Sequence, residues 1–159
     1  MSDRESPTSR EADNANVAAV RELYRTWNAA GPVAFCVLLH PEVVWHELAE
    51  LPGAGDHHGR PEVQRHLMPL VDTVGMFRAS VEGIEERSGE VLAYLHLHDT
   101  LTPSGVPLDY RVVHLHRLRE DMVDRIRAYA DLEQRSPTAP DAGNASAARR
   151  LLRARGPWR

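Results

Sequence analysis

Apolar residues recur at two different spacings along this chain. Between residues 17 and 27 they follow the helical period of 3.6, which predicts a helix that ends at Gly31. Pro32 suits the first turn of a second, short helix, and Pro61 suits the first turn of a third. The residues that can cap the N-terminus of the first helix are Asp13, Asn14 and Asn16. Three helices are therefore expected.

In the remaining periodic segments, apolar and polar residues alternate, as they do in β-strands. A short strand is predicted at residues 42–48, followed by a loop, and four longer strands are predicted after the third helix, at 77–87, 90–101, 108–118 and 122–132. Turn-forming residues separate these four runs, which indicates hairpins. The order of elements predicts an α+β fold in which helices cover one face of a curved antiparallel sheet. Residues 1–13 and 136–159 lack the pattern, so we expect disordered tails around a single domain at 14–135.

Composition narrows the class of protein. The chain has 159 residues, of which 42% are hydrophobic and 26% are charged, as in ordinary globular proteins. The sequence contains no run of apolar residues long enough to span a membrane and no apolar N-terminal leader, so a cytoplasmic protein is expected. Residues 14–135 carry 12 arginines and 18 acidic residues, which argues against nucleic-acid binding by the domain, and the basic segment at 136–159 is interpreted as a solvated tail.

Glu47 stands out because it is a carboxylate on an apolar strand. Alternation places Val43, Trp45 and Glu47 on one face. An acid in an apolar pocket has a raised pKa and can serve as a general acid or base near neutral pH. The alternative is a carboxylate that is exposed at the strand end or paired with arginine.

Two His-x-His pairs lie on neighbouring predicted strands, His96 with His98 and His114 with His116. If both pairs faced the same side, four imidazoles could gather a metal ion, but the register of the hairpin is not fixed by the sequence. Because no carboxylate or cysteine stands at a recognisable ligand spacing, we expect no metal and no other cofactor.

Four local patterns resemble the SnoaL-like family of the nuclear-transport-factor-2-like superfamily, which includes ketosteroid isomerase and polyketide cyclases. The resemblance spans about residues 16–133, and its patterns lie at residues 23–31, 40–47, 52–60 and 123–131. It implies a cone-shaped curved antiparallel sheet covered by three helices, the cystatin-like α+β barrel. It also implies a small-molecule pocket and a homodimer; the outer sheet face, with Val113 and Leu115, is the expected contact.

The resemblance also suggests roles for residues. Glu47 falls at the isomerase's proton-shuttling aspartate, His114 at its oxyanion-stabilising aspartate, and Leu23 at its oxyanion tyrosine, with Tyr24 next in sequence. The residues expected to bind the substrate are Trp27, Trp45, His57, His116 and Tyr129.

These residues predict a cofactor-free acid/base enzyme of the isomerase or cyclase type, acting on an apolar oxygenated small molecule, with secondary metabolism as the suggested setting. One alternative is a non-catalytic small-molecule-binding module of the same fold. A second is a metal-dependent enzyme that uses the paired histidines.

Overall fold

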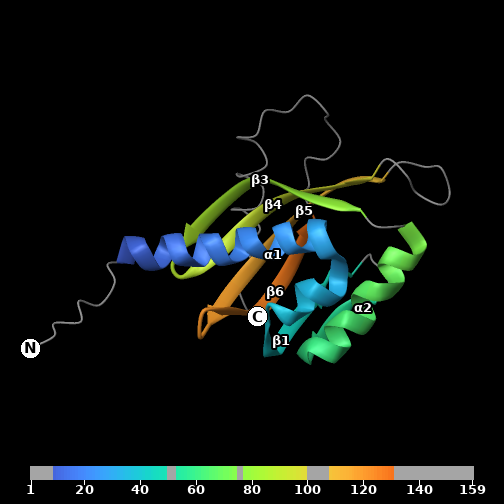
Figure 1. The fold of residues 1–159 in the computed structure, drawn as a ribbon, viewed down its shortest axis with the longest axis horizontal. Helices are drawn as coiled ribbons and strands as arrows, with labels where there is room; N and C mark the ends of the chain where they lie inside the picture. Colours follow the sequence, from blue (N-terminus) through green and yellow to red (C-terminus); the bar gives the residue numbers. More distant parts are fainter. Residues whose placement is uncertain (1–8, 50–52, 75–76, 100–107, 131–159) are drawn as a thin grey trace, which may run out of the picture.

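The computed structural model describes residues 9–49, 53–74, 77–99 and 108–130 (Figure 1). Eight elements follow one another along the chain: α1 (Ser9–Val37), β1 (Leu39–Glu47), β2 (Gly55–His58), α2 (Gly59–Val74), β3 (Arg78–Arg87), β4 (Glu90–Asp99), β5 (Leu108–Arg119) and β6 (Met122–Ala130). The predicted α+β class is confirmed. No helix in the described part of the chain is long and apolar enough to cross a membrane.

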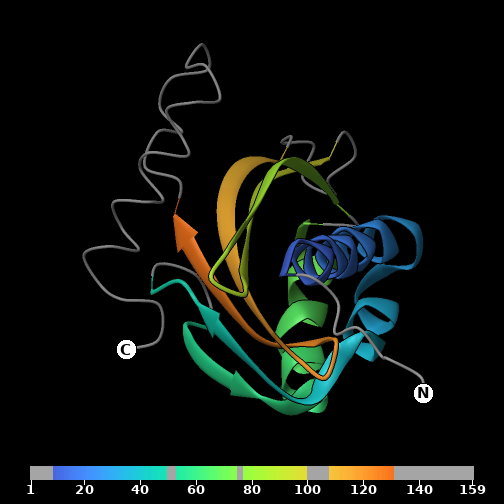
Figure 2. The same cartoon turned by 90° about the vertical axis from the view of Figure 1, so that its left-hand side faces the viewer.

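The six strands form one sheet in the order β2-β1-β6-β5-β4-β3. Neighbouring strands are antiparallel except β1 and β6, which run parallel, so the sheet is mixed rather than wholly antiparallel as predicted. Figure 2 shows the sheet bending around α1 and α2, with its two edges left unjoined. This open, curved sheet gives the molecule a concave face that both helices cover.

The first helix is longer than predicted and contains a sharp break. It begins at Ser9, before the predicted caps, so residues 9–13 are helical instead of part of a tail. At Gly31 the backbone has φ 85° and ψ −167°, a conformation that essentially only glycine adopts. The predicted break between two helical segments is therefore confirmed, although they form one kinked element. Within the described residues, the three predicted helical segments are therefore present as two elements, α1 with its two segments and α2. Residues 1–8 and 131–159 lie outside the described part.

The main core fills the space between the concave face and the helices. Trp27 and Leu23 of α1, Leu67 of α2 and Ile126 of β6 are among its buried residues. Asn28 fastens α1 to the edge strand β3: its Nδ2 donates to the Ala79 carbonyl at 2.9 Å, and its Oδ1 accepts from the Ala79 amide at 2.8 Å. Trp27 Nε1 donates to the carbonyl of Phe77 at 3.0 Å. The edge strand is thus held through its backbone.

A second apolar cluster lies on the opposite, convex face. It contains Leu92 on β4, Val113 and Leu115 on β5, and Tyr129 on β6, all of them buried. Cross-strand register explains the grouping, since Leu92 pairs with Leu115 and Val113 with Tyr129. The sheet is therefore apolar on both faces in its centre.

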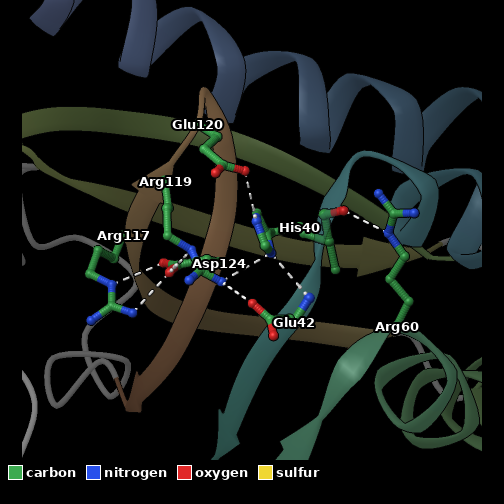
Figure 3. A network of polar contacts seen from close by, with 8 residues as sticks. His40, Glu42, Arg60, Arg117, Arg119, Glu120 and Asp124 are labelled. Carbon is green, nitrogen blue, oxygen red and sulfur yellow. Dashed lines mark hydrogen bonds and ion pairs between the residues drawn. The ribbon is translucent and has the colours of Figure 1, made fainter.

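A polar network fixes the start of β1 against the β5–β6 turn (Figure 3). Asp124, which is buried, accepts two hydrogen bonds from Arg117, each of 2.9 Å. Arg119 donates to Glu42 on β1 at 2.7 Å, and His40 lies 3.3 Å from Glu120. Because Asp124 is buried and bidentate with Arg117, this pair holds the hairpin more firmly than an exposed pair would.

Candidate functional site

A cavity of about 250 Å³ opens between α1, α2 and the concave face of the sheet. Its walls are mostly aromatic and aliphatic. The lining residues are Tyr24, Trp27, Phe35, Trp45, Glu47, Leu67, Leu70, Phe77, Ala79, Leu95, Leu97, Tyr110, Val112 and His114. Glu47 and His114 are the acid and the imidazole in this lining. A small apolar molecule fits such a space, and these two groups are placed to contact its polar part.

Glu47 lies at the end of β1 and is 6% exposed. Its Oε2 accepts hydrogen bonds from Trp45 Nε1 at 3.1 Å and from His66 Nε2 at 2.7 Å. Its Oε1 accepts from the Leu48 amide at 2.9 Å. Alternation along β1 puts Trp45 and Glu47 on one face, as predicted, and α2 brings His66 to the same carboxylate.

The pKa of Glu47 is set by opposing effects. Burial raises it, whereas the hydrogen bonds from His66 and the Leu48 amide and the charge interactions with His114 and His66 lower it. The net pKa lies below the ordinary value of a glutamate. Donors that stabilise the charged form therefore outweigh desolvation, and Glu47 is a carboxylate at neutral pH.

His114 on β5 belongs to a chain of three buried polar groups. The Tyr24 hydroxyl of α1 lies 2.8 Å from His114 Nδ1 and 2.6 Å from His116 Nε2. On the far side, His116 Nδ1 lies 3.0 Å from the carbonyl oxygen of Val91 on β4. The indole of Trp45 packs edge-on against the His114 ring, with centroids 5.2 Å apart. The imidazole of His114 is thus held on two sides.

Burial makes this chain electrically neutral at neutral pH. Desolvation lowers the pKa of His114 to about 4, although Glu47 acts in the opposite direction. Desolvation and the neighbouring His114 lower the pKa of His116 to about 3. Burial raises the pKa of Tyr24 well above its usual range. The cavity therefore combines one carboxylate with an uncharged imidazole.

The strand register separates the two His-x-His pairs. His114 faces Ala93 and His116 faces Val91 across the β4–β5 ladder, so both histidines share a face with alternate residues of β4. His96 and His98 occupy the alternate positions of β4, so their side chains point to the opposite face of the sheet. There Nε2 of His96 lies 2.6 Å from Oδ1 of Asp109. The four imidazoles do not converge on one ion, and the described residues contain no other group of three suitable ligands.

Comparison with known proteins decides the family. Residues 20–127, more than half of the chain, match the SnoaL-like domain. The chain belongs to the SnoaL-like family. No protein with a curated description matches its sequence.

Solved structures with the same fold extend this result. TerC, crystallised with polyporic acid, is 17% identical, with a TM-score of 0.64 over 74% of this chain and 92% of TerC. A protein of ketosteroid isomerase-like fold from Catenulispora acidiphila, in complex with trimethylamine, is 13% identical, with a TM-score of 0.61 over 72% of this chain and 85% of that one.

A third similar structure is an NTF2-like protein from Burkholderia pseudomallei. It is 18% identical, with a TM-score of 0.64 over 85% of this chain and 95% of that one. Identities this low show a shared fold, and a shared fold does not fix a reaction.

The SnoaL-like domain brings four of the seven predicted site residues to the cavity. Trp27, Trp45, Glu47 and His114 line it. His116 is fully buried behind His114, and it reaches the cavity only through Tyr24.

The other two predicted residues lie elsewhere. The ring of His57, on β2, stacks on the ring of His66, with centroids 4.1 Å apart. His57 therefore lies beside the histidine that is hydrogen-bonded to Glu47, and it is not part of the cavity lining. Tyr129 belongs to the convex cluster, because its parity on β6 is opposite to that of Ala128.

Two residues of this SnoaL-like domain that form hydrogen bonds with Glu47 and His114 were not among the predicted site residues. His66 has a side chain that is 4% exposed, and its spacing from Val63 on the apolar face of the α2 helix could have revealed it. Tyr24 follows Leu23, the residue that the resemblance aligned with the isomerase's oxyanion tyrosine, and its hydroxyl lies between the two histidines. Both are on the predicted apolar faces of helices, and a polar residue on such a face is the pattern that identifies them.

Proposed function

We propose that this protein is an acid/base enzyme of the isomerase or cyclase type, acting on an apolar oxygenated small molecule, such as a secondary metabolite. The observation that carries the proposal is the placement of Glu47 and His114 in one aromatic cavity, both in contact with Trp45. A carboxylate and a neutral imidazole in an apolar site are groups that accept, hold and return a proton.

The roles follow from the protonation states. Glu47, already ionised, takes a proton from a carbon or hydroxyl of the ligand, while His114 contacts the ligand oxygen at which charge changes. His66 and the Leu48 amide keep the carboxylate oriented during the transfer. The aromatic walls exclude water, which strengthens each of these electrostatic interactions.

A non-catalytic binding module is the second candidate. It is favoured by the hydrogen bonds that already satisfy Glu47, since a carboxylate with three donors is also what a purely structural site would contain. TerC and the Catenulispora protein were each crystallised with a small molecule, which fits either candidate.

Deuterium exchange separates the two candidates even while the natural substrate is unidentified. The probe is a bicyclic 1,3-diketone, 2-acetyl-1-tetralone, whose acidic C–H exchanges with D₂O when a base removes the proton. We expect the wild type to accelerate this exchange, and Glu47→Gln to lower the acceleration on the order of a hundredfold. Glu42→Gln, an exposed carboxylate on the same strand, is the matched control and keeps the wild-type rate.

Binding of the probe with no acceleration of exchange by the wild type would favour the binding module. Acceleration that survives in Glu47→Gln would exclude Glu47 as the base.

For the assembly, we propose a homodimer through the convex face of the sheet, as the sequence suggests.

A further inference from the structure

The hydrogen-bond chain from Val91 to His114 has a direction that can be worked out atom by atom. A carbonyl oxygen only accepts, so the hydrogen between His116 and Val91 sits on His116 Nδ1. His116 is fully buried and, within the described residues, has Tyr24 and Val91 as its hydrogen-bond partners. A neutral ring with a hydrogen on Nδ1 has a lone pair on Nε2, and the low pKa of His116, about 3, agrees with neutrality.

The hydroxyl of Tyr24 determines which ring nitrogen of His114 carries a hydrogen. Its hydroxyl has a single hydrogen, which must point to the His116 Nε2 lone pair 2.6 Å away. The oxygen of Tyr24 then accepts from His114, 2.8 Å away, so His114 also carries its hydrogen on Nδ1. In the neutral ring this leaves Nε2 of His114 as a lone pair, and His114 lines the cavity.

Three of the donors that line the cavity point elsewhere. Trp27 Nε1 donates to the Phe77 carbonyl, Trp45 Nε1 donates to Glu47, and the Tyr24 hydroxyl donates to His116. Glu47 itself offers only oxygen lone pairs. Beside Trp45, a polar group of the ligand thus meets two acceptors, the carboxylate of Glu47 and Nε2 of His114.

We propose that Tyr24 and His116 are positioning residues that hold His114 as a hydrogen-bond acceptor, and that the ligand group bound there is a hydroxyl, phenolic or enolic, rather than a carbonyl. This inference deepens the proposed function, because it rests on the same cavity and names the ligand group that His114 receives. The ligand O–H donates to Nε2, which raises electron density on the ligand oxygen and on the conjugated carbon. A carbonyl in the same position would face a lone pair and leave Nε2 of His114 unpaired.

The tautomer is tested on the free protein, so the result does not depend on turnover. Long-range ¹⁵N–¹H spectra of histidine-labelled protein at pH 7.5 distinguish a protonated from an unprotonated ring nitrogen. We expect Nδ1–H for both His114 and His116. In Tyr24→Phe, His114 loses its partner and shifts toward Nε2–H, whereas His116 keeps Nδ1–H because Val91 remains. A disturbed fold would not move one histidine alone in this way.

The ligand group is tested with three probes by calorimetry: 2-naphthol, 2-methoxynaphthalene and 2-naphthylmethylammonium. We expect 2-naphthol to bind at least tenfold more tightly than its methyl ether, and Tyr24→Phe to remove most of that preference. In His116→Leu the Tyr24 hydroxyl has no acceptor behind it and turns to donate to His114 Nδ1. Nε2 then carries the hydrogen, and the methyl ether, which can accept, gains relative to the phenol.

Three results would overturn the proposal. One is Nε2–H on His114 in the wild type. Another is equal affinity for the phenol and its ether. The third is tightest binding of the ammonium probe, which would move recognition to the charge of Glu47. If the tautomer is as expected, and the diketone binds through its enol hydroxyl but its exchange is not accelerated, this inference stands and the catalytic function alone fails.

Discussion

Burial and hydrogen bonding act on the Glu47 carboxylate in opposite directions, and at His114 burial acts with little opposition. Burial is the largest single effect on the pKa of Glu47, yet the hydrogen bonds from His66 and Leu48 and the charge interactions with His114 and His66 together reverse it. His114 lacks comparable help, because its Nδ1 neighbour Tyr24 is uncharged. Of the two ionisable residues in the same cavity, the carboxylate of Glu47 is therefore charged and the imidazole of His114 is neutral.

The neutral histidines predict a loss of stability in mild acid. In the unfolded chain a histidine has a pKa of about 6.5. In the folded protein the pKa of His114 is about 4 and that of His116 is about 3. Stability is therefore fully present above the unfolded pKa and falls as the pH drops below it, by on the order of 2 kcal/mol per histidine by pH 5. Urea unfolding at pH 7.5, 6 and 5 measures this slope.

A matched pair of variants assigns the slope. His114→Gln should lose about half of the pH dependence between pH 7 and 5, whatever its absolute stability. His58→Gln, at an exposed position on β2, should keep the full slope. If both variants retain the wild-type slope, then His114 is protonated in the folded protein and the neutral chain is refuted. Glu47 does not interfere, since its lowered pKa changes stability only as the pH falls through the carboxylate range, below about pH 5.

At this scale the sequence shows which face a residue occupies but not its charge. Alternation correctly grouped Glu47 with Trp45, and it grouped His114 with His116. The net direction of the Glu47 pKa depended on His66, which reaches it from a different element and 19 positions away in sequence. Contacts between elements of this kind are absent from any local pattern.

At the scale of elements, one side chain joins a helix to a sheet edge. Asn28 satisfies both backbone groups of Ala79 on β3, the last strand in the sheet order. Unpaired backbone groups on an edge strand are sites at which other chains can pair. The amide of Asn28 therefore protects the edge and also keeps α1 close enough for Trp27 to line the cavity.

Asn28→Asp tests this clamp with minimal change in shape. The aspartate still accepts from the Ala79 amide, but it loses the donor to the Ala79 carbonyl and places a second oxygen against it. We expect a loss of about 1–3 kcal/mol in the free energy of unfolding, measured by urea denaturation. Arg25→Ala, which removes an exposed contact with Glu22 on the same helix, should cost less than about 0.5 kcal/mol. Equal midpoints for Asn28→Asp and the wild type would contradict the clamp.

Elements with a strong period were predictable, and elements formed by contact were not. The four long strands and the break at Gly31 follow from alternation and from glycine chemistry. The short strand β2 was predicted as loop up to residue 56, because Gly55–His58 has no apolar alternation and is defined by its pairing with β1. The parallel pairing of β1 with β6 was also beyond reach, since it joins segments far apart in the sequence.

At the scale of the whole molecule, the convex face sets the expected assembly. Val113 and Leu115 lie there with Leu92 and Tyr129, flanked by Arg111 and Arg117. We expect light scattering at micromolar concentration to give about twice the chain mass of 17.8 kDa. A mass of one chain at about 100 µM would refute the homodimer, and it would show that the burial of these residues within a single chain is sufficient.

The parallel pairing of β1 with β6 has a consequence for biosynthesis. β1 provides Trp45 and Glu47, yet one of its two neighbours in the sheet is the last strand described, with Trp45 opposite Ile126. During translation β1 leaves the ribosome long before β6 is made, and closing so long a loop is a slow step in folding. Until β6 has been synthesised, the apolar strand that carries Glu47 lacks this partner, and an unpaired strand edge of this kind is prone to aggregate.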